Sequence, residues 1–211
     1  MMRDAWPATF TAALLTLALA TAGAAQFTAN FRAWTSEDAR RVRVVEAPPR
    51  LPALDGVSAS AEAISLWPPG VRDAPVYLLA FIYTRCPSIC RIAGEEFELL
   101  QRELRRGEDE RIRLLSLSFD PAFDTPERLR DYGTKHRVDP GYWTLMTPTS
   151  SAALSALLRA AGVVVIDDGL GGYAHNAAIH VVAGDGRLMR IFDIADYASA
   201  LAYARRLAER G

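Results

Sequence analysis

The sequence predicts an α/β fold in which a mixed, mostly parallel central sheet is flanked by helices. Apolar stretches of strand length alternate with segments of helical periodicity after residue 51. Near the C-terminus, a turn sequence joins two further strands into a β-hairpin, and a last helix follows. Alternating strands and helices are typical of a parallel sheet, and a terminal hairpin adds antiparallel pairing. With 211 residues, half of them hydrophobic, the chain is long enough for one well-packed domain.

The first 25 residues differ in composition from the rest and have the features of a signal peptide. Arg3 supplies a weak positive charge, and residues 10–20 form an apolar run. That run has about 11 residues, whereas a spanning helix needs roughly 20. Ala22-Gly23-Ala24 fits the small-x-small pattern of a cleavage site. We therefore expect residues 1–25 to be a cleaved signal peptide of an exported, periplasmic protein, rather than a membrane anchor.

Residues 26–50 are predicted to form an N-terminal extension, and residues 51–211 the main domain. Within the extension, Thr35 or Ser36 is expected to cap a short helix. Residues 41–46 alternate weakly between polar and apolar side chains, which favours a strand. The Pro-rich stretch that follows ends regular structure.

The first half of the main domain contains two buried strands, each followed by a helix. Residues 76–83 form a continuous apolar run, as expected of a strand that is buried on both faces, and they lead directly into the segment with the cysteines. A second such strand is predicted at residues 112–119, and Thr125 is predicted to cap the next helix, which runs to about His136. The helix between these strands has its apolar face at Ala93, Phe97, Leu100 and Leu104.

The second half continues the alternation and ends in the hairpin. A strand is expected at 142–146, followed by a helix capped by Ser150 or Ser151. A strand-like segment at 163–166 and a Gly-rich loop at 167–173 come next. Paired strands at 177–183 and 188–192 lead to a final helix, whose apolar stripe is formed by Tyr197, Leu201, Ala204 and Ala208. In this order of elements, a cysteine motif lies between the first central strand and its helix. That combination is the thioredoxin arrangement.

Cys86 and Cys90 are the two cysteines of the chain. In an exported protein such a pair is usually a structural disulfide. A loop this short, however, contributes only about 2 kcal/mol in the chain-entropy model, and a domain of this size does not need it. Redox chemistry or metal binding is the better interpretation. The first turn of a helix places both sulfurs on one side and favours thiolates, which select copper(I), zinc or iron–sulfur clusters.

Two thiolates leave a metal ion under-coordinated, so a third donor is expected among the three histidines. His136 is predicted to be a solvated charge at the end of a helix, and His180 lies inside a predicted strand. His175 follows the Gly-rich loop, which can bring its side chain over the edge of the sheet that carries the cysteines. Its position alone leaves His175 as either a metal ligand or an ordinary surface histidine.

Three motifs recur here in the order and spacing of a known family. They are residues 81–90 (Phe-x-Tyr-Thr-Arg-Cys-Pro-x-x-Cys), residues 118–126 (Ser-Phe-Asp-Pro-x-x-Asp-Thr-Pro), and residues 173–179 (Tyr-x-His-Asn-x-x-Ile) with Asp185-Gly186-Arg187 downstream. The set resembles the Sco/SenC family of copper-binding assembly proteins over roughly residues 51–210. The resemblance implies a thioredoxin-like fold, copper as the bound metal, and Cys86, Cys90 and His175 as its ligands.

The resemblance also implies an exported protein that acts on the binuclear copper centre of a respiratory oxidase. The leading hypothesis is a copper(I) metallochaperone whose partner is a client copper protein. The alternative is a thiol–disulfide reductase, in which Cys86 and Cys90 form the redox pair that keeps a client's cysteines reduced. A peroxiredoxin-type peroxidase is disfavoured because its Pro-x-x-x-Thr-x-x-Cys pattern is absent. A net charge of -1 with scattered basic residues argues against a nucleic-acid partner, and membrane contact would come only through the client or an uncleaved N-terminal segment.

Asp120 and Asp124 occupy ordinary turn positions, one at the end of a strand and one before a helix cap. The resemblance makes them candidates for contacts beside the site. Two neighbours of the implied ligands depart from the family pattern. Arg91 stands where the family usually has Pro, and Ala174 where it usually has Asp. Because both lie next to ligands, we expect metal affinity and redox potential to be shifted.

Overall fold

The computed structural model describes residues 5–28, 33–70, 74–85 and 89–210, and for 5–8, 27 and 89–91 it describes the backbone alone. The chain forms two compact units, Met1–Glu46 and Ala47–Gly211.

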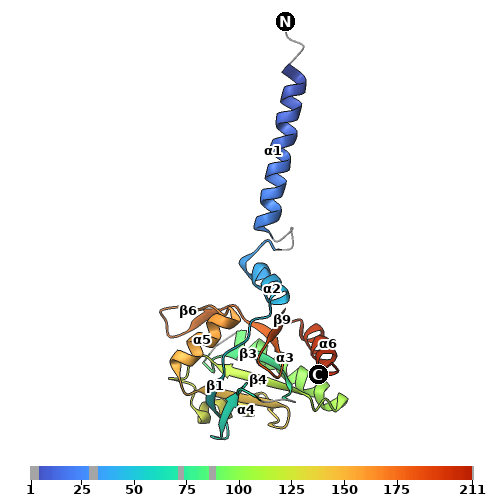
Figure 1. The fold of residues 1–211 in the computed structure, drawn as a ribbon. Helices are drawn as coiled ribbons and strands as arrows, with labels where there is room; N and C mark the ends of the chain where they lie inside the picture. The colour runs from blue at the N-terminus through green and yellow to red at the C-terminus, as the bar shows by residue number, and fades with distance from the viewer. Residues whose placement is uncertain (1–4, 29–32, 71–73, 86–88, 211) are drawn as a thin grey trace. The chain divides into compact units, whose positions relative to one another are not determined.

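Helix α1 (Ala5–Phe27) is the first element of the N-terminal unit (Figure 1). It contains an 18-residue segment, Thr9–Gln26, with a mean hydropathy of 1.3, which is long and apolar enough to cross a membrane. This segment is longer than the apolar run seen in the sequence because the helix continues through small residues such as Ala24 and Ala25, and alanine is the best helix former. A signal sequence satisfies the same criteria, so α1 is compatible with export.

Helix α2 (Ser36–Glu46) corrects the prediction of a strand at residues 41–46. The Thr35 hydroxyl accepts a hydrogen bond from the Asp38 N–H at 3.0 Å, and the Asp38 carboxylate accepts one from the Thr35 N–H at 3.1 Å. These reciprocal bonds cap the helix as a capping box does. Glu37 also pairs with Arg40 at 2.6 Å and with Arg41 at 3.2 Å, one turn along. The cap and the ion pairs stabilise the helix, and the weak alternation of polar and apolar residues at 41–46 is not enough to form a strand.

A seven-stranded sheet forms the centre of the second unit, in the order β2-β1-β5-β4-β3-β8-β9. Its strands are β1 (Leu54–Ser58), β2 (Ala63–Leu66), β3 (Val76–Ile82), β4 (Ile112–Ser118), β5 (Trp143–Pro148), β8 (Ala178–Val182) and β9 (Leu188–Asp193). Strands β5, β4 and β3 pair in parallel at the centre, and the outer strands on each side pair antiparallel. The predicted hairpin is β8–β9, whose turn uses Gly186 at a φ of 86°. Strands β1 and β2 were not predicted.

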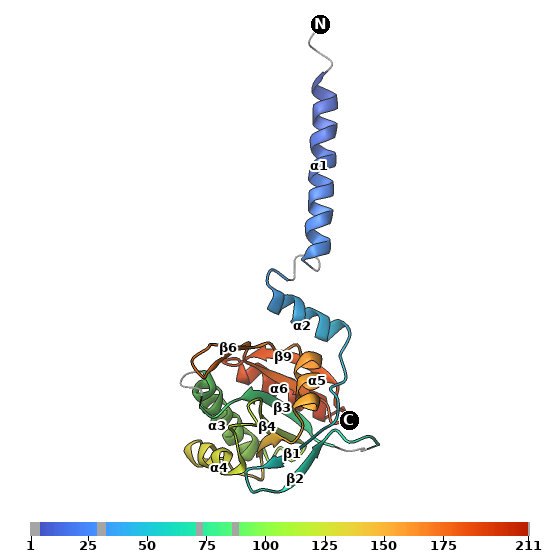
Figure 2. The same ribbon diagram turned by 90° about the vertical axis from the view of Figure 1, so that its left-hand side faces the viewer.

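The helices of this unit are α3 (Ile89–Gly107), α4 (Pro126–Lys135), α5 (Ser151–Ala161) and α6 (Tyr197–Ala208). Helix α3 packs on β3 and β4, and it also contacts α6. Figure 2 shows α3 and α4 on one face of the sheet and α5 on the other. Two predicted caps are confirmed: Thr125 accepts a hydrogen bond at the start of α4, and Ser150 does so at the start of α5.

His136, which follows α4, is buried rather than solvated, and only 7% of it is exposed. Its ring lies 4.5 Å from that of Tyr132, and its Nδ1 lies 3.0 Å from a carboxylate oxygen of Glu98 in α3. Gly94 leaves space for the ring, since a Cβ at that position would overlap it. The charged neighbours Lys135 and Arg137 led to the prediction of a solvent-exposed position. The packing of His136 against α3, which is distant in the sequence, buries the ring instead.

Candidate metal and redox site

The candidate site lies where β3 ends and the chain turns toward α3. Strand β3 ends at Ile82, and α3 begins at Ile89, so Cys90 belongs to the first turn of that helix. Cys86 lies outside the described residues, as does the side chain of Cys90.

Asp124 holds the chain just before the cysteines. Its side chain is fully buried, and it accepts hydrogen bonds from the Thr84 N–H at 3.1 Å and from the Thr84 hydroxyl at 2.6 Å. The Ser118 hydroxyl donates a third bond at 2.6 Å. Burial raises the pKa of Asp124, and the bonds from Ser118 and Thr84 offset part of that rise. The carboxylate thus joins the end of β4 to the residue two before Cys86.

Asp120 holds the next residue, Arg85. The Arg85 guanidinium donates two hydrogen bonds to one carboxylate oxygen of Asp120, at 2.7 and 3.1 Å. Its central carbon also lies 4.4 Å from the centre of the Phe123 ring. The hydrogen bond to Asp120 raises the pKa of Arg85, which stays protonated. Both aspartates singled out in the sequence therefore contact the segment that leads into Cys86.

His175 reaches this region from a separate hairpin. Strands β6 (Val165–Asp167) and β7 (Tyr173–His175) pair antiparallel, so the predicted Gly-rich loop is partly strand. The His175 ring lies 4.9 Å from the Phe119 ring and 6.5 Å from the Tyr83 ring. Phe119 follows β4 and Tyr83 follows β3, so the structure brings His175 to the same end of the sheet as the cysteine segment.

Both ring nitrogens of His175 are buried, and neither has a hydrogen-bond partner among the described side chains and backbone. Burial lowers the pKa of His175, and a polar contact with the Phe81 backbone, which does not meet hydrogen-bond geometry, offsets only part of this shift. The imidazole is therefore neutral near pH 7. A buried, neutral and unpartnered imidazole fits a group that donates to a metal ion.

The other histidines are not part of this arrangement. His180 is buried in β8, where it pairs in register with Leu79 and packs edge-on against Phe81 at 5.2 Å. It thus belongs to the interior of the sheet rather than to its end. Within the described portion of the chain, no group of three His, Cys, Asp or Glu side chains is placed to hold a metal ion, and that portion omits both cysteine side chains.

Tyr83 and Phe119 were not singled out in the sequence, although they contact His175. Each is part of a recognised motif and directly follows a buried strand. Aromatic residues at the ends of neighbouring parallel strands were the available signal, since such positions meet at one edge of the sheet.

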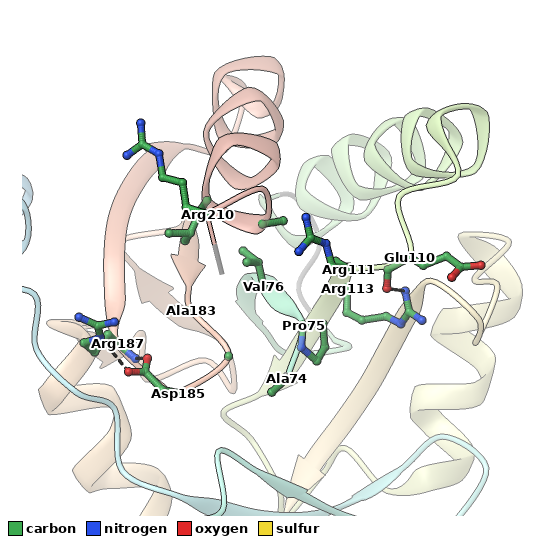
Figure 3. Close-up of a pocket in the computed structure, with 13 residues that line it drawn as sticks. Ala74, Pro75, Val76, Glu110, Arg111, Arg113, Ala183, Asp185, Arg187 and Arg210 are labelled. Atoms are coloured by element: carbon green, nitrogen blue, oxygen red, sulfur yellow. Dashed lines mark hydrogen bonds and ion pairs between the residues drawn. The ribbon is translucent and has the colours of Figure 1, made fainter. Parts of the chain in front are cut away.

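A cavity of about 660 Å³ lies at the opposite end of β3 (Figure 3). Its lining includes Val76, where β3 begins, and the four arginines Arg111, Arg113, Arg187 and Arg210. Arg113 donates to the Glu110 carbonyl at 2.8 Å, and Arg187 pairs with Asp185 at 2.8 Å. Since β3 runs from this cavity to the candidate site, the two are separate features of the molecule.

Comparisons with known proteins identify a family. Residues 72–209 match the model of the SCO1/SenC family. The chain is 25% identical to the SCO1 protein homolog of Bacillus subtilis (strain 168) over 141 residues, which are 66% of this chain and 68% of that protein.

Two solved structures with the same fold are similar to this chain. One is BsSco, described as having a disulfide switch and as a member of the Sco family of cytochrome c oxidase assembly proteins (TM-score 0.66, 19% identity, 77% of this chain and 95% of that one). The other is ScoI of Bradyrhizobium japonicum with copper bound (TM-score 0.59, 20% identity, 75% of this chain and 99% of that one). The mixed sheet with flanking helices is thus a fold shared with Sco proteins.

Proposed function

Because the chain belongs to the SCO1/SenC family, we propose that Cys86, Cys90 and His175 hold copper(I), which the protein delivers to a client copper protein. The observation that carries the proposal is the His175 ring, whose nitrogens are both buried without a hydrogen-bond partner in the described structure. Leaving such a group unsatisfied costs on the order of 1–3 kcal/mol. A role as a metal ligand explains why the cost is tolerated at this position.

The donor set suits the metal. Thiolates are soft ligands that select copper(I), zinc or iron–sulfur clusters, and imidazole also suits copper. Among these metals, the copper-bound structure of Bradyrhizobium japonicum ScoI favours copper(I). Asp120 and Asp124 are not ligands in this proposal, because their oxygens accept hydrogen bonds from Arg85, Thr84 and Ser118. Their role is to fix the path of the chain into Cys86.

The client that fits the proposal is an oxidase subunit with a binuclear copper site, in the periplasm. BsSco, a relative in fold, is described as a cytochrome c oxidase assembly protein. Helix α1 supports export, and we propose that it is removed as a signal peptide so that the mature chain begins near Ala25 or Gln26. Intact-mass measurement of the protein from an exporting host tests this; a full-length, membrane-bound product would show that α1 is an anchor.

A thiol–disulfide reductase is the second candidate. Cys90 lies in the first turn of α3, where the positive end of the helix dipole favours a thiolate. In this alternative the cysteine pair reduces a client's disulfide and becomes oxidised itself. A disulfide has no thiolates for copper(I), so one pair can serve both functions only at different times.

The deciding experiment titrates the reduced protein with copper(I) against a competing chelator. We expect one copper(I) per chain, and none after the thiols are oxidised to a disulfide. His175→Ala should lower the copper(I) affinity at least about tenfold while leaving the thiol redox potential nearly unchanged.

His180→Ala is the matched control, because His180 is buried in β8 and should affect stability more than the affinity of the folded protein. If His175→Ala binds copper(I) as tightly as the wild type, the site with two sulfurs and one nitrogen is wrong and the reductase becomes the better explanation.

A further inference from the structure

The hydroxyl of Tyr83 is bonded to both backbone groups of one residue in β7. It donates a hydrogen bond to the Tyr173 carbonyl at 3.1 Å and accepts one from the Tyr173 N–H at 3.1 Å. Tyr83 directly follows β3 in the segment that leads to Cys86, and Tyr173 begins the strand that ends at His175. One side chain therefore connects the two chain segments that carry the proposed ligands.

The surroundings of this hydroxyl make the connection specific. Tyr83 is only 2% exposed, and its ring packs against Phe119 at 5.2 Å and against Tyr173 at 5.3 Å. Hydrogen bonds in such a low-dielectric environment are stronger than in water, and a buried partner left without its bond costs free energy. The Tyr173 backbone is thus held at a defined position relative to the end of β3.

Strand β6 and the tip of the β6–β7 hairpin have little apolar packing. Ile166 in β6 is largely exposed, and Leu170 at the tip is 92% exposed. At its base, the Asn176 side chain accepts a hydrogen bond from the Val164 N–H at 2.8 Å and donates one to the Gly162 carbonyl at 3.1 Å. These bonds secure the base of the hairpin, but they do not connect β7 to β3.

We propose that Tyr83 is a positioning residue for copper(I) binding, which sets the His175 ring over the end of β3 by holding the backbone of Tyr173. Residues two apart in a strand share a face, so a fixed Tyr173 also fixes where His175 points. This inference rests on the proposed function, because it assigns Tyr83 the task of holding a ligand in place. Outer contacts of this kind typically change metal affinity by about 10- to 100-fold when they are removed.

Tyr83→Phe is the test variant, because it removes the hydroxyl and keeps the ring contacts. We expect the copper(I) affinity of the reduced protein to fall about tenfold, with the thiol redox potential unchanged, since the disulfide does not involve His175. Amide hydrogen exchange at Tyr173 in the metal-free protein should become faster. Tyr77→Phe is the matched control: Tyr77 is in β3 itself, and its ring packs against Trp67 at 6.1 Å, far from the hairpin.

A double-mutant cycle separates positioning from general support. In the His175→Ala background, Tyr83→Phe should cause no further loss of affinity, because its effect passes through His175. An equal loss in both backgrounds, or no loss in the wild type, would overturn the proposal. If His175→Ala alone leaves the affinity unchanged, the proposed function fails, and Tyr83 then has no ligand to position.

Discussion

The polar groups at the two ends of strand β3 differ in burial and in hydrogen bonding. At the end that leads to Cys86, Asp124 and Ser118 are fully buried, and they are hydrogen-bonded to each other. At the end that begins with Val76, the charged groups lie at the surface, where the half-buried Asp185 pairs with the exposed Arg187 and Arg50. One strand thus has a fixed polar network at one end and solvated charges at the other, and Figure 3 shows Asp185 and Arg187 at the second of these ends.

This difference shows that the geometry is fixed precisely at the end of β3 that leads to Cys86. Exposed ion pairs are worth little, because water solvates each charge equally well when the pair is broken. Buried hydrogen bonds have no such substitute, so the groups that make them stay in one arrangement. A metal site needs donors at defined positions, and the buried end of β3 provides the support that such a site requires.

The largest expected effect comes from Asp124→Ala. It leaves the hydroxyl of the fully buried Ser118, and the N–H and hydroxyl of the half-buried Thr84, without their acceptor. Since each stranded buried donor costs on the order of 1–3 kcal/mol, we expect the free energy of unfolding to fall by about 2–4 kcal/mol. Urea denaturation of the reduced protein measures it. A loss below about 1 kcal/mol would show that this network is not what distinguishes the two ends of β3.

A smaller, pH-dependent effect should come from the same carboxyl. In the unfolded chain the pKa of Asp124 is 3.8, and burial raises it in the native protein. Between pH 3.8 and the raised native pKa, the native protein therefore binds more protons than the unfolded chain. The contribution of this group to stability is therefore complete below pH 3.8 and is lost as the pH rises through the raised pKa. The stability of the wild type relative to Asp124→Asn should decrease over that interval, as measured by urea unfolding at a series of pH values. A stability difference between the two proteins that stays constant or increases with pH would show that the pKa of Asp124 is not raised.

Arg85→Gln should have a weaker effect than Asp124→Ala, because the guanidinium is partly exposed whereas its partner Asp120 is buried. Asp120 would lose both hydrogen bonds from Arg85, but water can replace part of that interaction. We expect a modest loss of stability and a modest loss of copper(I) affinity, measured by denaturation and by chelator competition. An Asp120→Asn, Arg85→Gln double variant no worse than either single variant would confirm that the two side chains act as a pair.

The smallest effect is expected at the opposite end. Arg187→Ala removes an exposed partner of Asp185, which Arg50 also contacts at 3.2 Å. The unfolding free energy should change by no more than about 0.5 kcal/mol, and copper(I) affinity should not change. A calorimetric melting curve in low and high salt checks this. A loss as large as that of Asp124→Ala would remove the contrast between the two ends of the strand.

The sequence predicted elements that strong local signals determine. Strands β3 and β4 are continuous apolar runs, and Thr125 and Ser150 are efficient helix caps. Strands β1 and β2 escaped prediction because they are short: β1 includes Gly56, and β2 is mostly exposed or half-buried. In α2, the alternation of polar and apolar residues resembles the pattern of a strand. The capping hydrogen bond between Thr35 and Asp38, three residues apart, stabilises the helix instead.

Parts of the candidate site could be predicted because they lie in ordered motifs. Asp120, Asp124 and His175 were singled out in this way, and the structure brings all three to the end of the sheet at which β3 stops. The role of Tyr83 could not be predicted, because its partner Tyr173 is 90 residues away and neither residue type signals the bond. The burial of His136 against Gly94 was hidden for the same reason.

The position of β8 beside β3 has a consequence for the order of events during folding. Strands β3 and β4 can pair early, whereas β8 pairs with β3 through Tyr77 and Val182, from distant parts of the chain. Closing long loops costs entropy, so such non-local pairings form slowly. Under the proposed function, the two thiols of a newly made chain are therefore present before His175 reaches its place at the end of β3. The time that this slow pairing takes is then the time during which copper or an oxidant meets the thiols without the imidazole.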